Sequence, residues 1–156
     1  MGSRGFTTIE LIIVVVMIGV IATIAFPRVK DGLEKQQRRS MRAALVGYVA
    51  LARNSAVARG CRGSVHFVSG SNSRLWVTAC STRPGVTAAQ RDTLVGPIYT
   101  EAEWNHRFLA ARDSINYDGR GLRMPIGTST TIKIKTKADA DKDSIVVNGT
   151  GKVVYP

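Results

Sequence analysis

Histidine and cysteine, which often carry catalysis or bind metals, are scarce in this sequence. It has two histidines, His66 and His106, and two cysteines, Cys61 and Cys80. Neither histidine stands in a metal-ligand spacing such as His-Glu-x-x-His, and no phosphate-binding loop or nucleophile elbow is present. Cys61 and His66 are conceivable as a catalytic dyad, but nothing around them in the sequence would activate the thiol. We therefore predict that the protein is not an enzyme and holds no cofactor.

Acidic residues are also few. The 156 residues include 11 Asp and Glu against 22 Lys and Arg, which gives a formal net charge of +11. Such an excess suits an acidic partner: nucleic acid, anionic lipid or an acidic face of another subunit. If about 30 of the 156 residues form a membrane segment, roughly 100–125 remain, which is enough for one soluble domain.

One acidic group resembles a metal site only weakly. Asp139, Asp141 and Asp143 match the opening of a calcium-binding loop, but Ser144 stands where that loop needs glycine and Thr150 where it needs a bidentate glutamate. A solvated turn is the favoured interpretation, and calcium remains a weak candidate.

The clearest positive feature is an apolar run near the N-terminus. Between Leu11 and Pro27 the sequence has no charged residue, and Glu10 directly precedes this run. A helix from Phe6 to Phe26 spans about 31 Å, close to the thickness of a bilayer's hydrocarbon core. Placing a carboxylate near the middle of a membrane costs on the order of 2.5–3.5 kcal/mol, so it calls for a cation. The run supplies none, so the counterion of Glu10 should come from another molecule.

The helix is expected to continue beyond Pro27, because a proline can kink a helix without ending it. Apolar residues then recur every three or four positions, as on one face of an amphipathic helix: Val29, Leu33, Met41, Leu45, Val49, Ala52 and Ala56. Basic residues occupy the opposite side: Lys35, Arg38, Arg39, Arg42, Arg53 and Arg59. Gly60 is a natural stop. The pattern predicts one helix over residues 6–59.

The remainder reads as strands. Runs 64–69 and 74–80 flank turn residues and predict a hairpin, and a second hairpin is expected at 144–155. Residues 131–135 alternate like a half-buried strand. Residues 92–99 read as a short strand, 82–90 as a loop, and 101–112 as a helical turn or a loop with Trp104 and Phe108 turned inward.

Together these elements predict an α+β fold, in which a long N-terminal helix packs on an antiparallel β-sheet domain. Cys61 and Cys80 flank the first hairpin at similar distances from its turn. Either they form a disulfide across its open end, or both are buried free thiols.

The N-terminal residues carry a specific resemblance. Gly5-Phe6-Thr7-Thr8-Ile9-Glu10-Leu11, followed by the apolar run, resembles the class III signal of type IV pilins and type II secretion pseudopilins. The resemblance implies that a prepilin peptidase cuts after Gly5 and methylates Phe6. It also implies that Glu10 neutralises the terminal amine of a neighbouring subunit. An ordinary single-pass anchor with a stray glutamate is the alternative.

The same resemblance implies a domain plan and a location. Residues 1–5 would be a leader peptide, 6–27 a transmembrane and filament-core helix, 28–60 its amphipathic continuation, and 61–156 a periplasmic β-rich domain. The implied location is the bacterial inner membrane, as a single-pass protein, and then a pilus or pseudopilus. The implied partners are other pilins, membrane lipid before assembly, and an inner-membrane platform with its assembly ATPase.

Further segments resemble one branch of this family. Residues 52–58, the hairpin with Trp76, and segments 115–121 and 145–153 are similar to the GspH/FimT group of minor pseudopilins and minor pilins. That group usually ends in Gly-Arg with further basic residues, from which 151–154 depart. The implied role is a structural subunit in type II protein secretion or pilus assembly, with Glu10 and Pro27 serving assembly.

A DNA-binding role is the alternative. Some FimT-like minor pilins bind DNA through a Gly-Arg-x-Arg-type motif during natural transformation, and segment 119–123 of this sequence reads Gly-Arg-Gly-Leu-Arg. Arg120 and Arg123, with Lys133 and Lys135 nearby in sequence, would then contact phosphates without sequence preference. The family's motif lies nearer the chain end, however, and a solvated turn is the simpler interpretation of both arginines.

Overall fold

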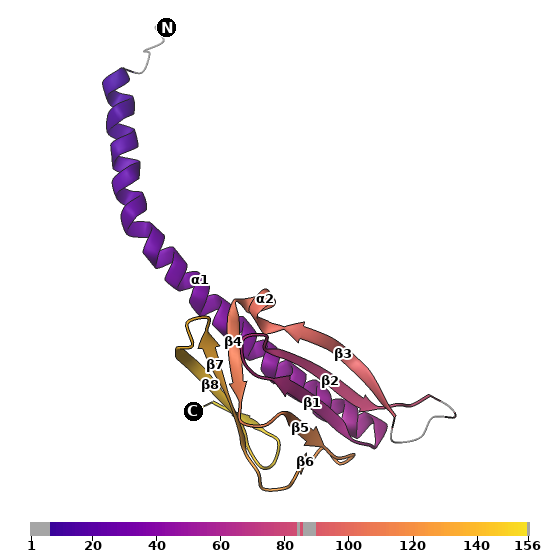
Figure 1. Ribbon diagram of the computed structural model, residues 1–156. Coiled ribbons are helices and arrows are strands. Elements are labelled where there is room, and N and C mark those ends of the chain that lie inside the picture. The colour runs from indigo at the N-terminus through magenta and orange to yellow at the C-terminus, as the bar shows by residue number, and fades with distance from the viewer. Residues whose placement is uncertain (1–6, 84, 86–89, 156) are drawn as a thin grey trace. The chain divides into compact units, whose positions relative to one another are not determined.

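The computed structural model describes residues 7–83, 85 and 90–155 (Figure 1). Residues 1–6, which hold the expected leader peptide and Phe6, and residues 84 and 86–89 of the expected 82–90 loop lie outside these ranges. The elements, in chain order, are α1 Thr8–Arg59, β1 Gly63–Val68, β2 Arg74–Cys80, β3 Arg91–Tyr99, α2 Thr100–Trp104, β4 His106–Ala110, β5 Ser114–Tyr117, β6 Arg123–Met124, β7 Thr130–Thr136, β8 Asp141–Val147 and β9 Val153–Val154. The chain divides into two units, Met1–Gln36 and Gln37–Pro156.

In the first unit the described chain is helical from Thr8 onward. The Thr7 hydroxyl accepts a hydrogen bond from the Glu10 N–H at 3.4 Å, and the Glu10 carboxylate accepts one from the Thr7 N–H at 3.5 Å. This reciprocal pair is a capping box, which satisfies amides that have no partner within the helix. The helix runs through Pro27 without a break, as the sequence predicts.

In the second unit, the rest of α1 supplies one wall of the core. The predicted stripe is confirmed for its later members, which are at most 2% exposed: Met41, Leu45, Val49, Ala52 and Ala56. Two earlier members, Val29 and Leu33, lie in the first unit and are 57% and 54% exposed. The prediction was wrong for these two, because apolar periodicity marks a face but not what covers it.

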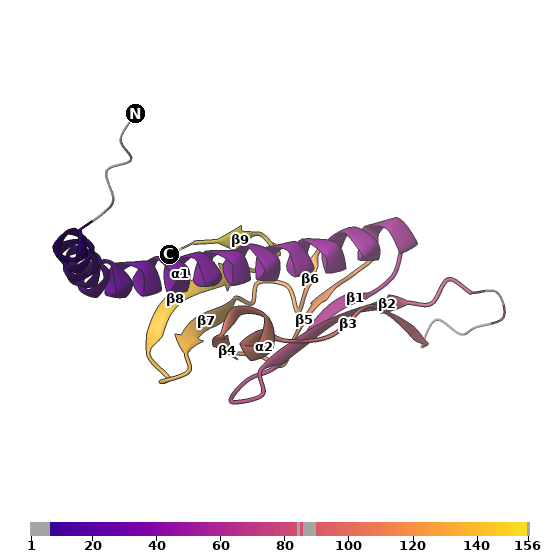
Figure 2. The same ribbon diagram turned by 90° about the horizontal axis from the view of Figure 1, so that it is seen from above.

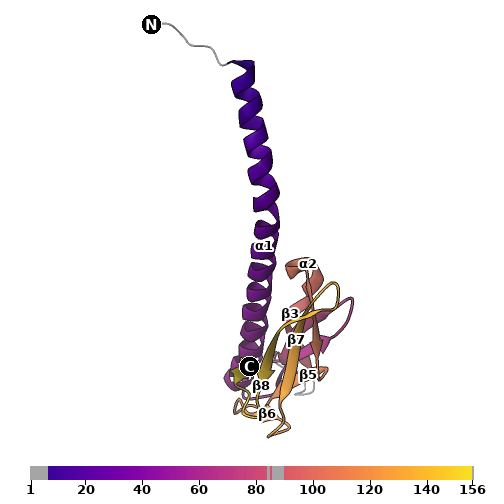
Figure 3. The same cartoon turned by 90° about the vertical axis from the view of Figure 1, so that its left-hand side faces the viewer.

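Two antiparallel sheets complete the second unit. A five-stranded sheet has the order β3-β2-β1-β5-β6, and a four-stranded sheet has the order β4-β7-β8-β9. Figures 2 and 3 show most of these strands on one side of the second half of α1. Inward residues of both sheets meet the helix stripe in a single core, including Val65, Phe67, Ile115, Ile132 and Ile145. The predicted α+β fold is confirmed.

The predicted hairpins are confirmed in position. β1 pairs with β2 from Gly63↔Ala79 to Val68↔Arg74, and β8 pairs with β9 across the turn at 148–152. Segment 101–112, for which the sequence predicts a helical turn or a loop, contains most of α2 and the whole of strand β4. The short strands β5 and β6 were not predicted.

The structure joins Cys61 and Cys80 by a disulfide, with the two Cα atoms 6.2 Å apart. Cys61 follows the end of α1, and Cys80 closes β2. The sequence left open either a disulfide or two free thiols, and the structure has the disulfide. Because Cys61 is bonded to Cys80, the conceivable dyad with His66 has no free thiol.

Candidate functional site

The most unusual surface of the protein is the first unit itself. From Ile9 to Phe26 its large apolar side chains are 46–68% exposed: Ile9, Leu11, Ile12, Ile13, Val14, Val15, Val16, Met17, Ile18, Val20, Ile21, Ile24 and Phe26. None of the most apolar window of α1 is buried, and it is long and apolar enough to cross a membrane. A core helix of a soluble protein would be mostly covered. An exposed apolar surface of this extent is typical of a site that contacts lipid or other protein.

Glu10 lies at the start of this apolar surface. Its carboxylate contacts only the Thr7 N–H and hydroxyl, both at 3.5 Å, and within the described ranges no cation pairs with it. The expectation that its counterion comes from elsewhere stands as a prediction.

Arg123 has a different role from the one the sequence suggested. It lies on β6 opposite Tyr117 of β5, and it is 1% exposed. Its guanidinium donates hydrogen bonds to the carbonyl oxygens of Thr128, Val147 and Asn148 and to the Thr130 hydroxyl. Burial lowers the pKa of Arg123, and the nearby Tyr117 opposes that effect. This corrects the DNA-contact prediction for Arg123, because its side chain is buried and both terminal nitrogens donate inside the protein.

The bonds of Arg123 join the two sheets. β6 is the edge strand of the five-stranded sheet, whereas Val147 ends β8 and Thr130 begins β7 in the four-stranded sheet. The Tyr117 hydroxyl donates to the Gly151 carbonyl at 3.2 Å across the same junction. Polar contacts of the Arg123 terminal nitrogens and the Tyr117 hydroxyl therefore hold the junction, whereas the buried Arg123 Nε has no hydrogen-bond partner among the described residues.

Arg120 remains at the surface, with 75% of its side chain exposed. It pairs with Asp118 at 2.9 Å, and the other Asp118 oxygen accepts hydrogen bonds from the Arg120 and Leu122 N–H groups. The Leu122 bond is the main cause of the lowered pKa of Asp118. Asp118 thus shapes the turn and offsets the charge of Arg120.

The two lysines also face carboxylates. Lys133 pairs with Asp141 at 2.9 Å, and Lys135 pairs with Asp139 at 3.2 Å and with Asp141 at 3.5 Å. These contacts lower the pKa of Asp141 and raise that of Lys135. Arg120, Arg123, Lys133 and Lys135 therefore do not form one exposed cluster of free cations.

The same contacts overturn the weak calcium candidate. Asp139 and Asp141 bind lysines, and Asp143 pairs with Arg42 of α1 at 3.1 Å. Among the residues that the structure describes, no three His, Cys, Asp or Glu side chains converge as a metal site would require. Asp139 precedes β8, and the pairing of β7 with β8 shifts register between the partners of Asp143 and Asp141, so the three carboxylates reach different cations.

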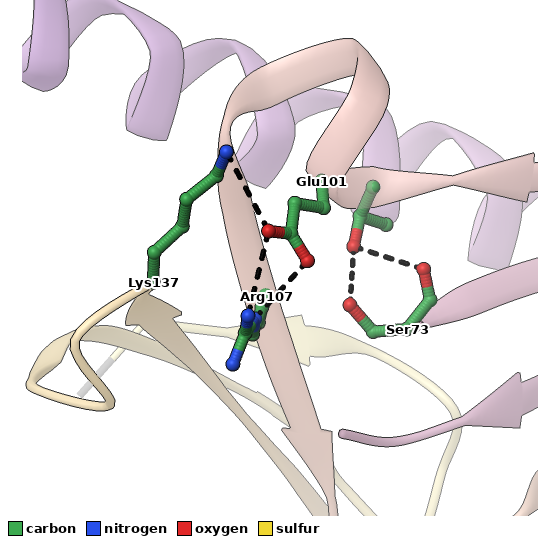
Figure 4. A network of polar contacts seen from close by, with 5 residues as sticks. Ser73, Glu101, Arg107 and Lys137 are labelled. Atoms are coloured by element: carbon green, nitrogen blue, oxygen red, sulfur yellow. Dashed lines mark hydrogen bonds and ion pairs between the residues drawn. The ribbon is translucent and has the colours of Figure 1, made fainter. Parts of the chain in front are cut away.

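A polar network that sequence reasoning missed ties α2 to the four-stranded sheet (Figure 4). Glu101 accepts hydrogen bonds from Arg107 of β4 at 3.1 Å and pairs with Lys137, just after β7, at 3.5 Å. Beside it, the Ser73 and Thr100 hydroxyls lie 2.6 Å apart in the buried interior. The partners come from separate elements, so no local sequence pattern could have revealed the network.

His66 is packed on the five-stranded sheet. Its ring stacks on Trp76 with centroids 5.0 Å apart, and its Nε2 lies 3.0 Å from the Thr78 hydroxyl. Burial, and next the charge of Arg91, lower the pKa of His66. The contacts are those of a packed side chain.

Comparison with known proteins gives matches in structure alone. No known family model and no curated protein sequence matches the chain. Two crystal forms of the type IV minor pilin FimU of Pseudomonas aeruginosa superimpose with TM-scores of 0.54 and 0.51 at 13% identity, covering 79% and 76% of this chain and 90% and 91% of FimU. The minor pseudopilin EpsH of the type 2 secretion system of Vibrio cholerae gives a TM-score of 0.53 at 12% identity, covering 76% of this chain and 94% of EpsH.

At identities of 12–13%, these neighbours show a shared fold and not a shared secretion or pilus system. The chain has the fold of type IV minor pilins and type II secretion minor pseudopilins.

Proposed function

We propose that the protein is a structural subunit, a minor pilin or minor pseudopilin, that a prepilin peptidase processes and that assembles into a type IV pilus or type II secretion pseudopilus. The observation that carries this proposal is the bare apolar helix of the first unit, joined in one chain to a domain with a pilin fold. Burial of one Val, Leu or Ile side chain contributes about 1.5–3 kcal/mol. An exposed run of such residues therefore strongly favours a lipid or helix-bundle environment.

Processing follows from the sequence around Gly5 and Phe6. Cleavage after Gly5 removes the basic leader and keeps the apolar helix on the mature protein, and methylation then modifies the amine of Phe6. In this proposal the helix resides in the inner membrane with the β-rich domain in the periplasm, until the assembly platform and its ATPase move the subunit into the filament.

Packing against other subunits explains the exposed residues that the fold does not use. Val29 and Leu33 continue the apolar surface beyond Pro27 and stay uncovered in the single chain. Helices of other pilins in a bundle would cover them together with the run from Ile9 to Phe26.

The DNA-binding alternative has less support. Arg123 is buried, and Arg120, Lys133 and Lys135 each pair with an aspartate. A gel-shift assay with Arg120→Ala still separates the two functions. The structural role predicts the same salt-dependent, non-specific binding before and after the change.

The mass of the mature protein tests the proposal. The full chain is expressed in cells with an active prepilin peptidase and extracted from membranes, and its N-terminus is determined by mass spectrometry. We expect a chain that begins with N-methylated Phe6. A membrane-bound chain that retains residues 1–5 would contradict the proposal, and Gly5→Ala serves as the unprocessed control.

A further inference from the structure

The apolar surface of the first unit ends at an aromatic ring that contacts a cation. Phe26, the last large apolar residue of the exposed run, is 62% exposed. The Nζ atom of Lys30, further along α1, lies 4.5 Å from the centre of the Phe26 ring. The ammonium group therefore sits at the level of the last apolar side chain of the run. In a helix that spans a bilayer, this level is where the hydrocarbon core meets the headgroups.

The cations at this level have no acidic partner within the described part of the chain. Arg28 and Lys30 are the first charged residues after Glu10, and both are exposed. Asp31 and Glu34 follow them in α1, but none of the ion pairs among the described residues includes Arg28 or Lys30. Both cations can therefore accept an anion from outside the chain.

The side of the membrane on which these cations would lie also calls for a partner. Lys and Arg orient a membrane span by staying on its cytoplasmic side. In the proposed orientation only Arg4 lies on that side, whereas Arg28 and Lys30 emerge on the other. They therefore need a role other than orientation. Headgroup phosphates surround a spanning helix at this depth, and a guanidinium can bind phosphate through two parallel hydrogen bonds.

We propose that Arg28 and Lys30 bind the phosphate groups of anionic phospholipid at the end of the apolar run, and that this contact holds the subunit in the membrane before it assembles. The inference rests on the proposed function, because it needs the apolar helix to span a bilayer. It goes beyond that function by assigning a lipid-binding site to two named cations. An acidic face of another subunit is the competing partner.

Lipid retention by the full chain tests the site. The chain is extracted from membranes in mild detergent and supplied with equal amounts of phosphatidylglycerol and phosphatidylcholine, and native mass spectrometry counts the lipids that stay bound. We expect wild type to retain phosphatidylglycerol preferentially. The variant Arg28→Gln/Lys30→Gln should lose about fivefold of this preference for each cation removed. The swapped chain Arg28→Lys/Lys30→Arg keeps both charges and should keep the preference.

The matched control Lys142→Gln/Lys152→Gln removes the same charge from exposed positions of the second unit and should retain lipid like wild type. Equal retention of phosphatidylglycerol by wild type and Arg28→Gln/Lys30→Gln, or an equal loss in the control, would overturn the site. If Arg28→Gln/Lys30→Gln keeps its phosphatidylglycerol but is depleted from sheared filaments, the cations face an acidic subunit surface and the lipid site is wrong. Recovery of the wild-type chain outside the membrane fraction would refute the proposed function, and the site with it.

Discussion

At the scale of single residues, the fold uses a charged side chain as an internal crosslink. Arg123 satisfies carbonyl groups at the ends of two strands and connects the edges of two sheets. Its sequence context, two glycines and another arginine, looks like an exposed turn. Only the pairing of β6 with β5, which directs Arg123 to the same side as Tyr117, shows that it turns inward.

Arg123→Ala should therefore lower the free energy of unfolding of the second unit by about 2–5 kcal/mol, because each buried carbonyl that loses its donor costs about 1–3 kcal/mol. Chemical denaturation of the full chain in mild detergent, followed by near-ultraviolet circular dichroism, measures this change. Arg120→Ala is the matched control and should stay within about 0.5 kcal/mol of wild type. Equal effects of the two substitutions would refute the crosslink.

His66 should make stability depend on pH. Its pKa in the folded protein lies below the ordinary value of 6.5, so folding favours the neutral ring. The stabilisation is complete above the unfolded pKa and declines as the pH falls through the folded pKa, because the unfolded chain then binds more protons. We expect the unfolding free energy to fall between pH 7.5 and about pH 5. A His66→Asn variant should lose part of this slope, and an unchanged slope would count against the assignment.

At the scale of elements, one glycine sets how closely α1 approaches the first strand. A Cβ atom on Gly63 would lie 2.2 Å from the carbonyl oxygen of Ala52 and 3.0 Å from the Ala56 Cβ. Since neither the helix backbone nor the strand can yield cheaply, a side chain at this position must push the two apart.

Gly63→Ala should consequently destabilise the protein by about 1–3 kcal/mol or more through overpacking. Gly47→Ala, within α1 where a Cβ meets nothing within 4 Å, should stabilise it by about 0.5–1 kcal/mol through helix propensity. The melting temperatures of both variants and of wild type, measured by thermal unfolding, test these two expectations. Shifts of the melting temperature in the same direction would contradict this account of the contact.

The elements that could be predicted from sequence are those with long or alternating patterns. α1 and the hairpins of β1–β2 and β8–β9 follow from apolar periodicity and turn residues. β4, β5 and β6 are short. The partners of β4 and β5 include the distant strands β7 and β1, and β6 has only two residues, which pair with β5. Pairing over such distances is decided by the tertiary fold, which local propensity does not contain.

At the scale of the whole molecule, contacts with other molecules are easier to predict from this sequence than the ion pairs within the protein. The apolar run and Glu10 point to other molecules because they have no partner in their own helix. The ion pairs of Lys133 and Lys135 could not be foreseen, since they depend on the register of β7 against β8. Net charge alone therefore overstated the basic surface available to DNA.

The central claim is that α1 packs with other subunits and that Glu10 is essential there. The most direct measurement is the amount of full chain in filaments sheared from cells that express wild type, Glu10→Ala or Glu34→Ala at equal levels. Glu34→Ala removes the same charge from the same helix and should assemble like wild type. The account predicts that Glu10→Ala is depleted at least about tenfold, since the neighbouring cation is left unpaired in apolar surroundings. Equal amounts of Glu10→Ala and wild type in the filaments would contradict it.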